Sequence, residues 1–124
     1  MAVTYTDAVK TSRMSATRDH FANGTLEIGT TGFATILCTF NLSPAGGTVA
    51  TDTWTVQFDA GNNTSSVTAT GSGTAVTARL KTNGGIIDLS GLTVGTIGTD
   101  IVLDNNVIAL GQTIQINGAT IQHA

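Results

Sequence analysis

The side chains that could do chemistry are few in this chain, and they lie far apart in its sequence. The two histidines, His20 and His123, form neither the His-x-x-x-His nor the Glu-x-x-His pair that holds zinc. The carboxylates are Glu27 and seven aspartates, and we expect most of the aspartates in turns, where Asp normally serves backbone hydrogen bonding. The Gly-x-Ser-x-Gly elbow of serine hydrolases is absent from the sequence. We therefore expect no enzymatic activity, no cofactor and no metal ion, with a hydrolase as the most distant alternative.

One loop leaves a weak calcium site open as an alternative. Asp100, Asp104, Asn105 and Asn106 bring oxygen atoms close together in sequence, and oxygen atoms are the ligands that calcium prefers. The spacing of an EF-hand is missing, and turn chemistry accounts for the same residues. We favour the turn.

Two side chains with distinctive chemistry are expected in the core. Cys38 is the single cysteine and lies in an apolar run, which favours a small buried hydrophobic residue over a reactive thiol. Trp54 alternates in phase with Val56 and Phe58, so we place it in the core rather than on a surface that binds sugars. An exposed Trp54 is what the carbohydrate-binding alternative requires.

The low charge of the chain limits the partners it can have. Only 10% of its 124 residues are charged, and the formal net charge is −3, so no basic field is available to hold a phosphate backbone. A surface poor in charge is easily desolvated, which favours packing against neighbouring proteins. No signal peptide and no apolar run long enough for a membrane span are visible.

The first two dozen residues differ from the rest and predict a helix over residues 7–22. Thr6 and Asp7 are typical of a helix start, and Asn23-Gly24 supplies a stop. Met14, Arg18 and Phe21 fall at i, i+4 and i+7. We therefore divide the chain into an N-terminal arm and helix, residues 1–24, and a β-domain, residues 25–124.

The remainder alternates with period two between turn residues, which predicts strands. The expected strands cover residues 25–28, 34–42, 53–58, 67–69, 76–81, 86–89, 92–94, 101–103 and 107–110, and a final pair of strands flanks Asn117-Gly118. We expect Pro44 to end the second strand, Gly111-Gln112 to form a type II′ turn, and Asn117-Gly118 to form a hairpin. The fold class is mainly β: an antiparallel β-sandwich or barrel (jelly-roll-like) with one short N-terminal α-helix.

Several stretches of the sequence resemble small Thr/Gly-rich virion proteins of tailed bacteriophages, of the head decoration or cement type. They are Ser12-Arg13-Met14-Ser15-Ala16-Thr17-Arg18-Asp19, Asn23-Gly24-Thr25-Leu26-Glu27-Ile28-Gly29-Thr30, Ala34-Thr35-Ile36-Leu37, Ala78-Arg79-Leu80, Leu92-Thr93-Val94-Gly95-Thr96, Gly98-Thr99-Asp100-Ile101-Val102-Leu103 and Gly111-Gln112-Thr113. The resemblance covers most of the chain and implies a virion component without chemistry.

Together with the low charge, the resemblance leads us to expect a capsid decoration protein that binds the major capsid protein lattice and stabilises the head. Its expected partners are the major capsid protein and copies of itself, with no nucleic acid, membrane or small-molecule substrate. Its expected location is the outer surface of the phage head, after synthesis in the host cytoplasm. The alternatives are a tail or baseplate component and a carbohydrate-binding module for host recognition.

The expected contact residues lie on the N-terminal arm and the helix: Val3, Tyr5, Val9, Met14 and Phe21. The arm, residues 2–5, carries apolar side chains with no evident internal partner and could add an edge strand to a neighbouring protein. Removing residues 1–24 is then expected to abolish capsid binding and to leave the β-structure in place.

Overall fold

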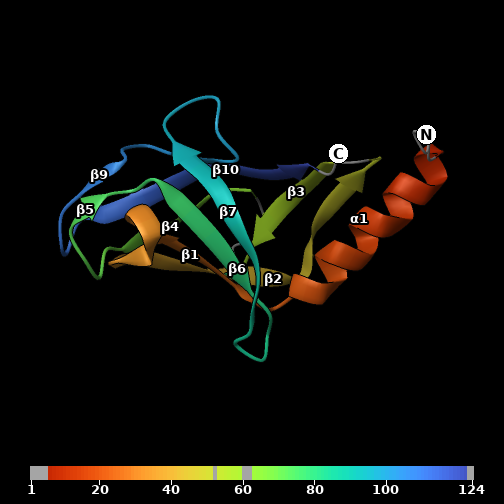
Figure 1. Ribbon diagram of the computed structural model, residues 1–124, viewed down its shortest axis with the longest axis horizontal. Helices are drawn as coiled ribbons and strands as arrows, with labels where there is room; N and C mark the ends of the chain where they lie inside the picture. The colour runs from red at the N-terminus through yellow and green to blue at the C-terminus, as the bar shows by residue number, and fades with distance from the viewer. Residues whose placement is uncertain (1–5, 52, 60–62, 123–124) are drawn as a thin grey trace.

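The computed structural model describes residues 6–51, 53–59 and 63–122, which form one α-helix and ten strands (Figure 1). In chain order the elements are α1 (Asp7–Phe21), β1 (Thr25–Gly29), the 3₁₀ turn η1 (Thr31–Phe33), β2 (Ile36–Ala50), β3 (Thr53–Phe58), β4 (Ser65–Thr68), β5 (Gly73–Thr74), β6 (Thr77–Lys81), β7 (Ile87–Gly95), β8 (Ile101–Leu103), β9 (Val107–Ile108) and β10 (Thr113–Gln122). The mainly β fold with one N-terminal helix is therefore confirmed.

Seven strands close into a barrel. Their order around it is β3, β2, β1, β6, β7, β8 and β10, and β10 then pairs with β3. Antiparallel neighbours reverse direction at each step, so a ring with an odd number of strands needs a parallel pair to close. That pair is β7 and β8, with Val94 opposite Ile101, and it is the one place where the ring departs from the antiparallel pattern expected from the sequence.

β3 and β4 occupy one position in the wall, between β2 and β10. β3 pairs with the second half of β10, with Thr55 opposite Thr120. β4 pairs with the first half, with Ser65 opposite Ile116, where the register of β3 carried forward would place residue 59. The two strands therefore behave as one strand interrupted by residues 59–64.

The expected hairpin at Asn117-Gly118 is wrong, because β10 runs straight through these residues. Its pairing with β8 shifts between Ile116 and Gly118, at the level where β4 gives way to β3. A Cβ on Gly118 would lie 3.2 Å from Oδ1 of Asn63. The glycine thus gives room to a neighbouring side chain and makes no turn.

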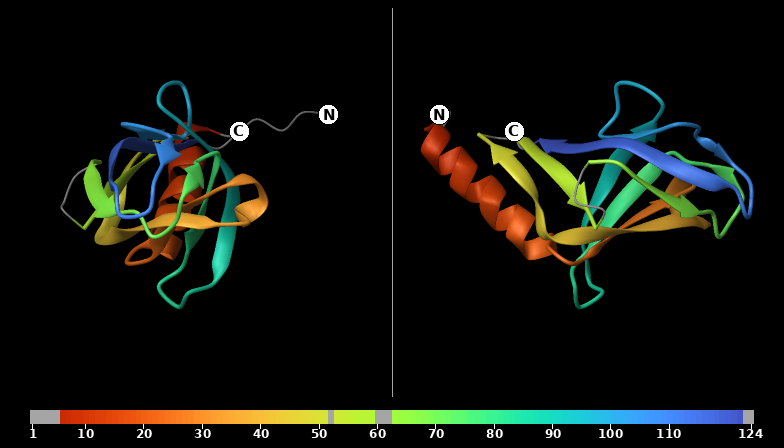
Figure 2. Two further views of the ribbon diagram at one scale, coloured as in Figure 1. Left: turned by 90° about the vertical axis from the view of Figure 1, so that its left-hand side faces the viewer. Right: turned by 180° about the vertical axis from the view of Figure 1, so that it is seen from behind.

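Pro44 does not end its strand either. β2 continues to Ala50, and its pairing with β3 shifts between Leu42 and Gly47. A proline is tolerated where a bulge removes the need for its missing N–H. Gly47 has φ +128°, and a Cβ there would lie 2.1 Å from the carbonyl oxygen of Thr55. The bulge lets β2 bend and follow α1 (Figure 2).

Two further local expectations are revised. Gln112 N donates to Ala109 O at 3.0 Å, so Gly111, with φ +84°, is the third residue of its turn. Positive φ at that position defines a type II turn and not type II′. The strands expected at 86–89 and 92–94 are joined in β7 across Gly91, which has φ +81°.

The barrel interior and one side of α1 share a single hydrophobic core. Met14 and Phe21 of α1 are buried in it, and the Phe21 ring stacks on Trp54 of β3 with centroids 6.2 Å apart. The expected core positions Trp54, Val56 and Phe58 are confirmed. The helix therefore has no core of its own, and residues 6–22 and the barrel pack as one body.

The first residues of two strands depart from the expected alternation. Alternation in phase with Cys38 and Phe40, and with Ala78 and Leu80, predicts Ile36 and Val76 on the inner face, but both are exposed. The pairing of β1 with β2 skips Leu37, which is buried beside Cys38, so a bulge breaks the alternation at the start of β2. β6 begins only at Thr77, which leaves Val76 outside the strand.

Candidate functional site

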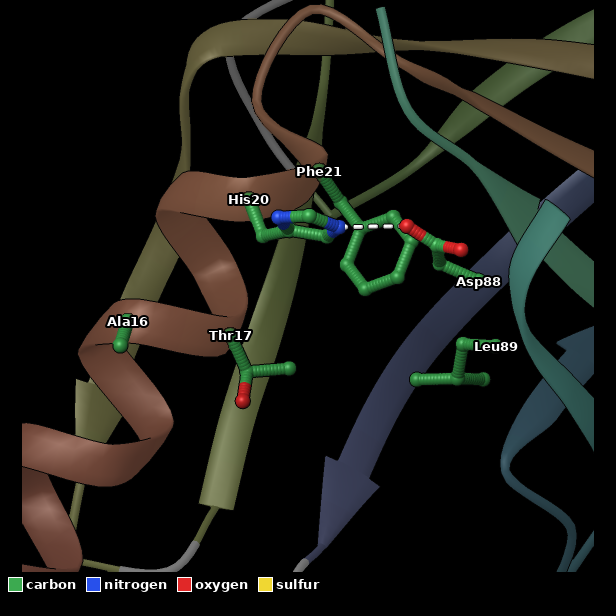
Figure 3. A pocket seen from close by; sticks show the side chains of 6 residues that line it. All are labelled: Ala16, Thr17, His20, Phe21, Asp88 and Leu89. Carbon is green, nitrogen blue, oxygen red and sulfur yellow. Dashed lines mark hydrogen bonds and ion pairs between the residues drawn. The ribbon is translucent and has the colours of Figure 1, made fainter. Parts of the chain in front are cut away.

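A groove lies between the last turns of α1 and the start of β7 (Figure 3). Its volume is about 520 Å³. The lining comes from the helix and the strand: Ala16, Thr17, His20, Phe21, Asp88 and Leu89. The groove is mainly apolar, with one pair of ionisable side chains across its upper edge.

That pair is His20 and Asp88, which join elements 68 residues apart in sequence. Nε2 of His20 lies 2.6 Å from Oδ2 of Asp88, and the imidazole meets the Phe21 ring edge-on at 5.1 Å. Thr17 also lines the groove, but its hydroxyl donates to the carbonyl oxygen of Arg13 at 3.1 Å. A nucleophile would need a hydrogen bond to its base, so the geometry fits a bridge between α1 and β7 better than a catalytic dyad.

The residues expected to contact a partner differ in their exposure to solvent. Val9 is exposed, with 42% of its surface accessible. Met14 and Phe21 are buried in the protein's own core and anchor α1 to the barrel. Val3 and Tyr5 lie outside the described residues. Phe21 also lines the groove, beside Ala16, Thr17 and Leu89, which the sequence did not single out.

An ion-pair cluster on the outer face of the barrel was missed at the sequence level. Arg79 and Lys81 alternate with the inward-facing Ala78 and Leu80, which predicts that they face solvent, but both pair with the buried carboxylate of Glu27. Nε of Arg79 lies 2.7 Å from Oε1, and Nζ of Lys81 lies 3.2 Å from Oε2. The Arg79 guanidinium also lies 4.1 Å from the centre of the Phe33 ring. Alternation of β1 and β6 places these residues on one face, but only their register places them opposite each other.

The residues considered for chemistry are engaged in internal contacts. Burial raises the pKa of the Cys38 thiol to about 12, so it stays protonated and unreactive at neutral pH. Trp54 is fully buried and donates from Nε1 to the carbonyl oxygen of Gly46 at 2.9 Å. The surface that the carbohydrate-binding alternative needs is therefore not formed by Trp54.

The loop considered for calcium uses its oxygen atoms within the fold. Oδ2 of Asp100 accepts from both the backbone N–H and the hydroxyl of Thr93, at 3.0 and 3.1 Å. Oδ1 of Asp104 accepts from the backbone N–H of Gln115 at 3.2 Å. Within the part of the chain that is described, no three metal-ligating side chains of His, Cys, Asp or Glu gather at one point. The Asp100–Thr93 contacts close the β7–β8 connection, and the Asp104–Gln115 contact joins the end of β8 to β10.

Large apolar side chains are exposed at several places on the surface. They are Val9, Ile36, Val76, Ile86, Ile87, Ile97, Val107 and Leu110. Ile86 and Ile87 lie at the hairpin between β6 and β7, and Ile97 lies on the loop between β7 and β8. The surface therefore carries apolar contact groups on a background poor in charge.

The barrel with its docked helix defines a fold, and comparison with other proteins adds no family to it. No protein-family model matches the chain, and neither a curated protein nor a solved structure matches it. Among the described residues there is no helix with the length and hydropathy needed to cross a bilayer.

Proposed function

We propose that this chain is a non-enzymatic structural protein of a tailed-phage particle, and within that class a decoration protein that binds the major capsid protein lattice on the outside of the head. The sequence resemblance described above supports the class. Many copies on a lattice would add modest individual contacts into a strong stabilisation of the head, since linked binding sites act at high effective concentration.

The observation that carries the proposal is the distribution of polar and apolar groups. Arg79 and Lys81 on the outer barrel face are both paired with Glu27, while eight large apolar side chains among the described residues are exposed. Exposed apolar side chains on a rigid surface supply contact energy in a protein interface. This pattern favours binding to another protein over catalysis.

The proposed lattice contact is the α1 side of the molecule. Val9 lies on the outer surface of α1 and is exposed, and Ala16 is exposed at the groove. The groove offers an apolar floor with a polar edge, as specific protein interfaces do. Met14 and Phe21 contribute indirectly, because they fix the position of α1 on the barrel.

The test is binding of the purified chain to phage heads that lack it. We expect wild-type protein to co-sediment with such heads and not with isolated tails. The double variant V9D/A16D should lose most of this binding, because it places two charges on the proposed contact. The control I97D alters an exposed residue on the β7–β8 loop and should bind normally.

Two results would contradict the proposal. Binding to tails alone would place the chain in the tail or baseplate, and equal binding of V9D/A16D and wild type would move the contact away from α1. Deletion of residues 1–24 is not a suitable test, because it also removes the core residues Met14 and Phe21.

A further inference from the structure

The three chain segments that form the end of the barrel opposite α1 contain no ionisable residue, and the guanidinium that packs on Phe33, that of Arg79, is paired with Glu27. This distal end is formed by residues 30–37, 69–77 and 105–112, which include β5 and β9 and lie at the far end of the long axis from the helix (Figures 1 and 2). Backbone hydrogen bonds join the three segments: Thr70 N to Leu37 O at 2.8 Å, Ala75 N to Asn106 O at 2.7 Å, and Gly111 N to Ala69 O at 3.1 Å.

Four exposed apolar side chains belong to these segments. Val107 and Leu110 have 62% and 69% of their surface accessible, and Ile36 and Val76 are exposed on the two segments that are hydrogen-bonded into the same end. Asp104 directly precedes the third segment, but its carboxylate accepts from Gln115 on β10. Small residues such as Gly, Ala, Ser and Thr make up most of the remainder, so covering these segments removes no charged side chain of theirs from water.

Side chains already satisfy backbone donors at this end. Val107 N donates to Oδ1 of Asn105, and Ala109 N donates to Oε1 of Gln112, both at 3.0 Å. Leu110 N donates to the Ser72 hydroxyl at 2.8 Å. With these donors occupied, the segment is a poor template for adding a strand. A partner would meet it through apolar side chains.

We propose that the distal end is a self-association surface on which two copies of this chain meet about a two-fold axis. Each copy has a formal net charge of −3, so identical molecules repel one another except where the facing surfaces carry no charge. An uncharged face places no like charges opposite each other when it meets its own copy. A two-fold contact is also closed and self-complementary, so it stops at the dimer.

Sedimentation equilibrium of the purified full-length chain over a dilution series tests the proposal without any phage component. We expect the mass to rise with concentration from 12.6 kDa toward twice that value. The variant V107K/L110K should stay at 12.6 kDa, because two facing copies would bring four lysines together. I97K, a change at the most exposed isoleucine outside the distal end, should dimerise like wild type.

A milder variant serves as a control in case V107K/L110K does not fold. Leu110 is largely exposed in one copy, so L110A should keep the far-ultraviolet circular dichroism of wild type and weaken the dimer roughly tenfold. A wild-type chain that remains monomeric at every concentration overturns the proposal. So does unchanged association of folded V107K/L110K. Loss of head binding by this variant while wild type stays monomeric would assign the distal end to the lattice instead.

Discussion

At the scale of single residues, Asn63 shows how one side chain can replace a missing stretch of strand. Its Nδ2 donates to the carbonyl oxygens of Val56 and Ala119, the second at 3.0 Å, and its Oδ1 accepts from Ala119 N at 3.2 Å. Ala119 thus has both backbone groups bonded to one amide, as it would beside a strand residue. The side chain thus joins β3 to β10 close to the gap between the end of β3 and the start of β4.

We expect N63A to lower the free energy of unfolding by about 2 kcal/mol, because partly buried backbone groups lose their partners. N63D should destabilise at least as much, since a carboxylate of the same shape cannot donate to the two carbonyl oxygens. Urea denaturation followed by circular dichroism measures both. The control N41A removes an exposed amide on β2 and should change stability little. Equal stability of N63A and N41A would rule out this role for Asn63.

At the scale of elements, α1 depends on its docking to the barrel. Its start is fixed locally, because the Thr6 hydroxyl accepts from Val9 N at 3.4 Å. Four Ser and Thr residues within it weaken its intrinsic helix propensity. Packing must therefore supply most of its stability. Met14 and Phe21 provide that packing, and the His20–Asp88 pair adds a second attachment to β7.

We expect M14A to lower the free energy of unfolding by about 3 kcal/mol, since it leaves a cavity in a fully buried site. The matched control is S12A, which changes an exposed position of the same helix and should be neutral or slightly stabilising. Thermal unfolding of both variants compares them directly. If M14A were as stable as S12A, the helix would not be anchored at this point.

At the scale of the whole molecule, closure of the ring and the shared core couple all parts of the chain. One edge of β10 pairs with β8, and its other edge pairs first with β4 and then with β3. Trp54, on β3, stacks against Phe21 of α1. Neither α1 nor any strand of the ring can therefore separate without breaking contacts of its neighbours. The two regions divided at residue 24 share one set of core contacts.

This coupling predicts a single unfolding transition. Trp54 is the only tryptophan, so its fluorescence reports the contact between α1 and β3, while far-ultraviolet circular dichroism reports the barrel. The two urea midpoints should coincide, as in other small two-state domains. An earlier fluorescence transition would show that the helix detaches alone and that residues 1–24 form a separate unit.

The sequence by itself determined what local patterns control. Period-two alternation located most strands and the inner positions Trp54, Val56 and Phe58, and capping residues located α1. Composition also showed how few side chains were available for chemistry. These features depend on near neighbours in the chain, so one sequence is enough to reveal them.

Only the tertiary structure decided how the strands are paired. A local rule predicts a turn at Asn117-Gly118, but the continuous β10 forms backbone hydrogen bonds with three strands, which a hairpin at this point would interrupt. Gly118 leaves space for the side chain of Asn63. The position of Glu27 between Arg79 and Lys81, the parallel pair that closes an odd ring and the uncharged distal end all depend on register between distant segments. Register is set by long-range packing, which no short stretch of sequence contains.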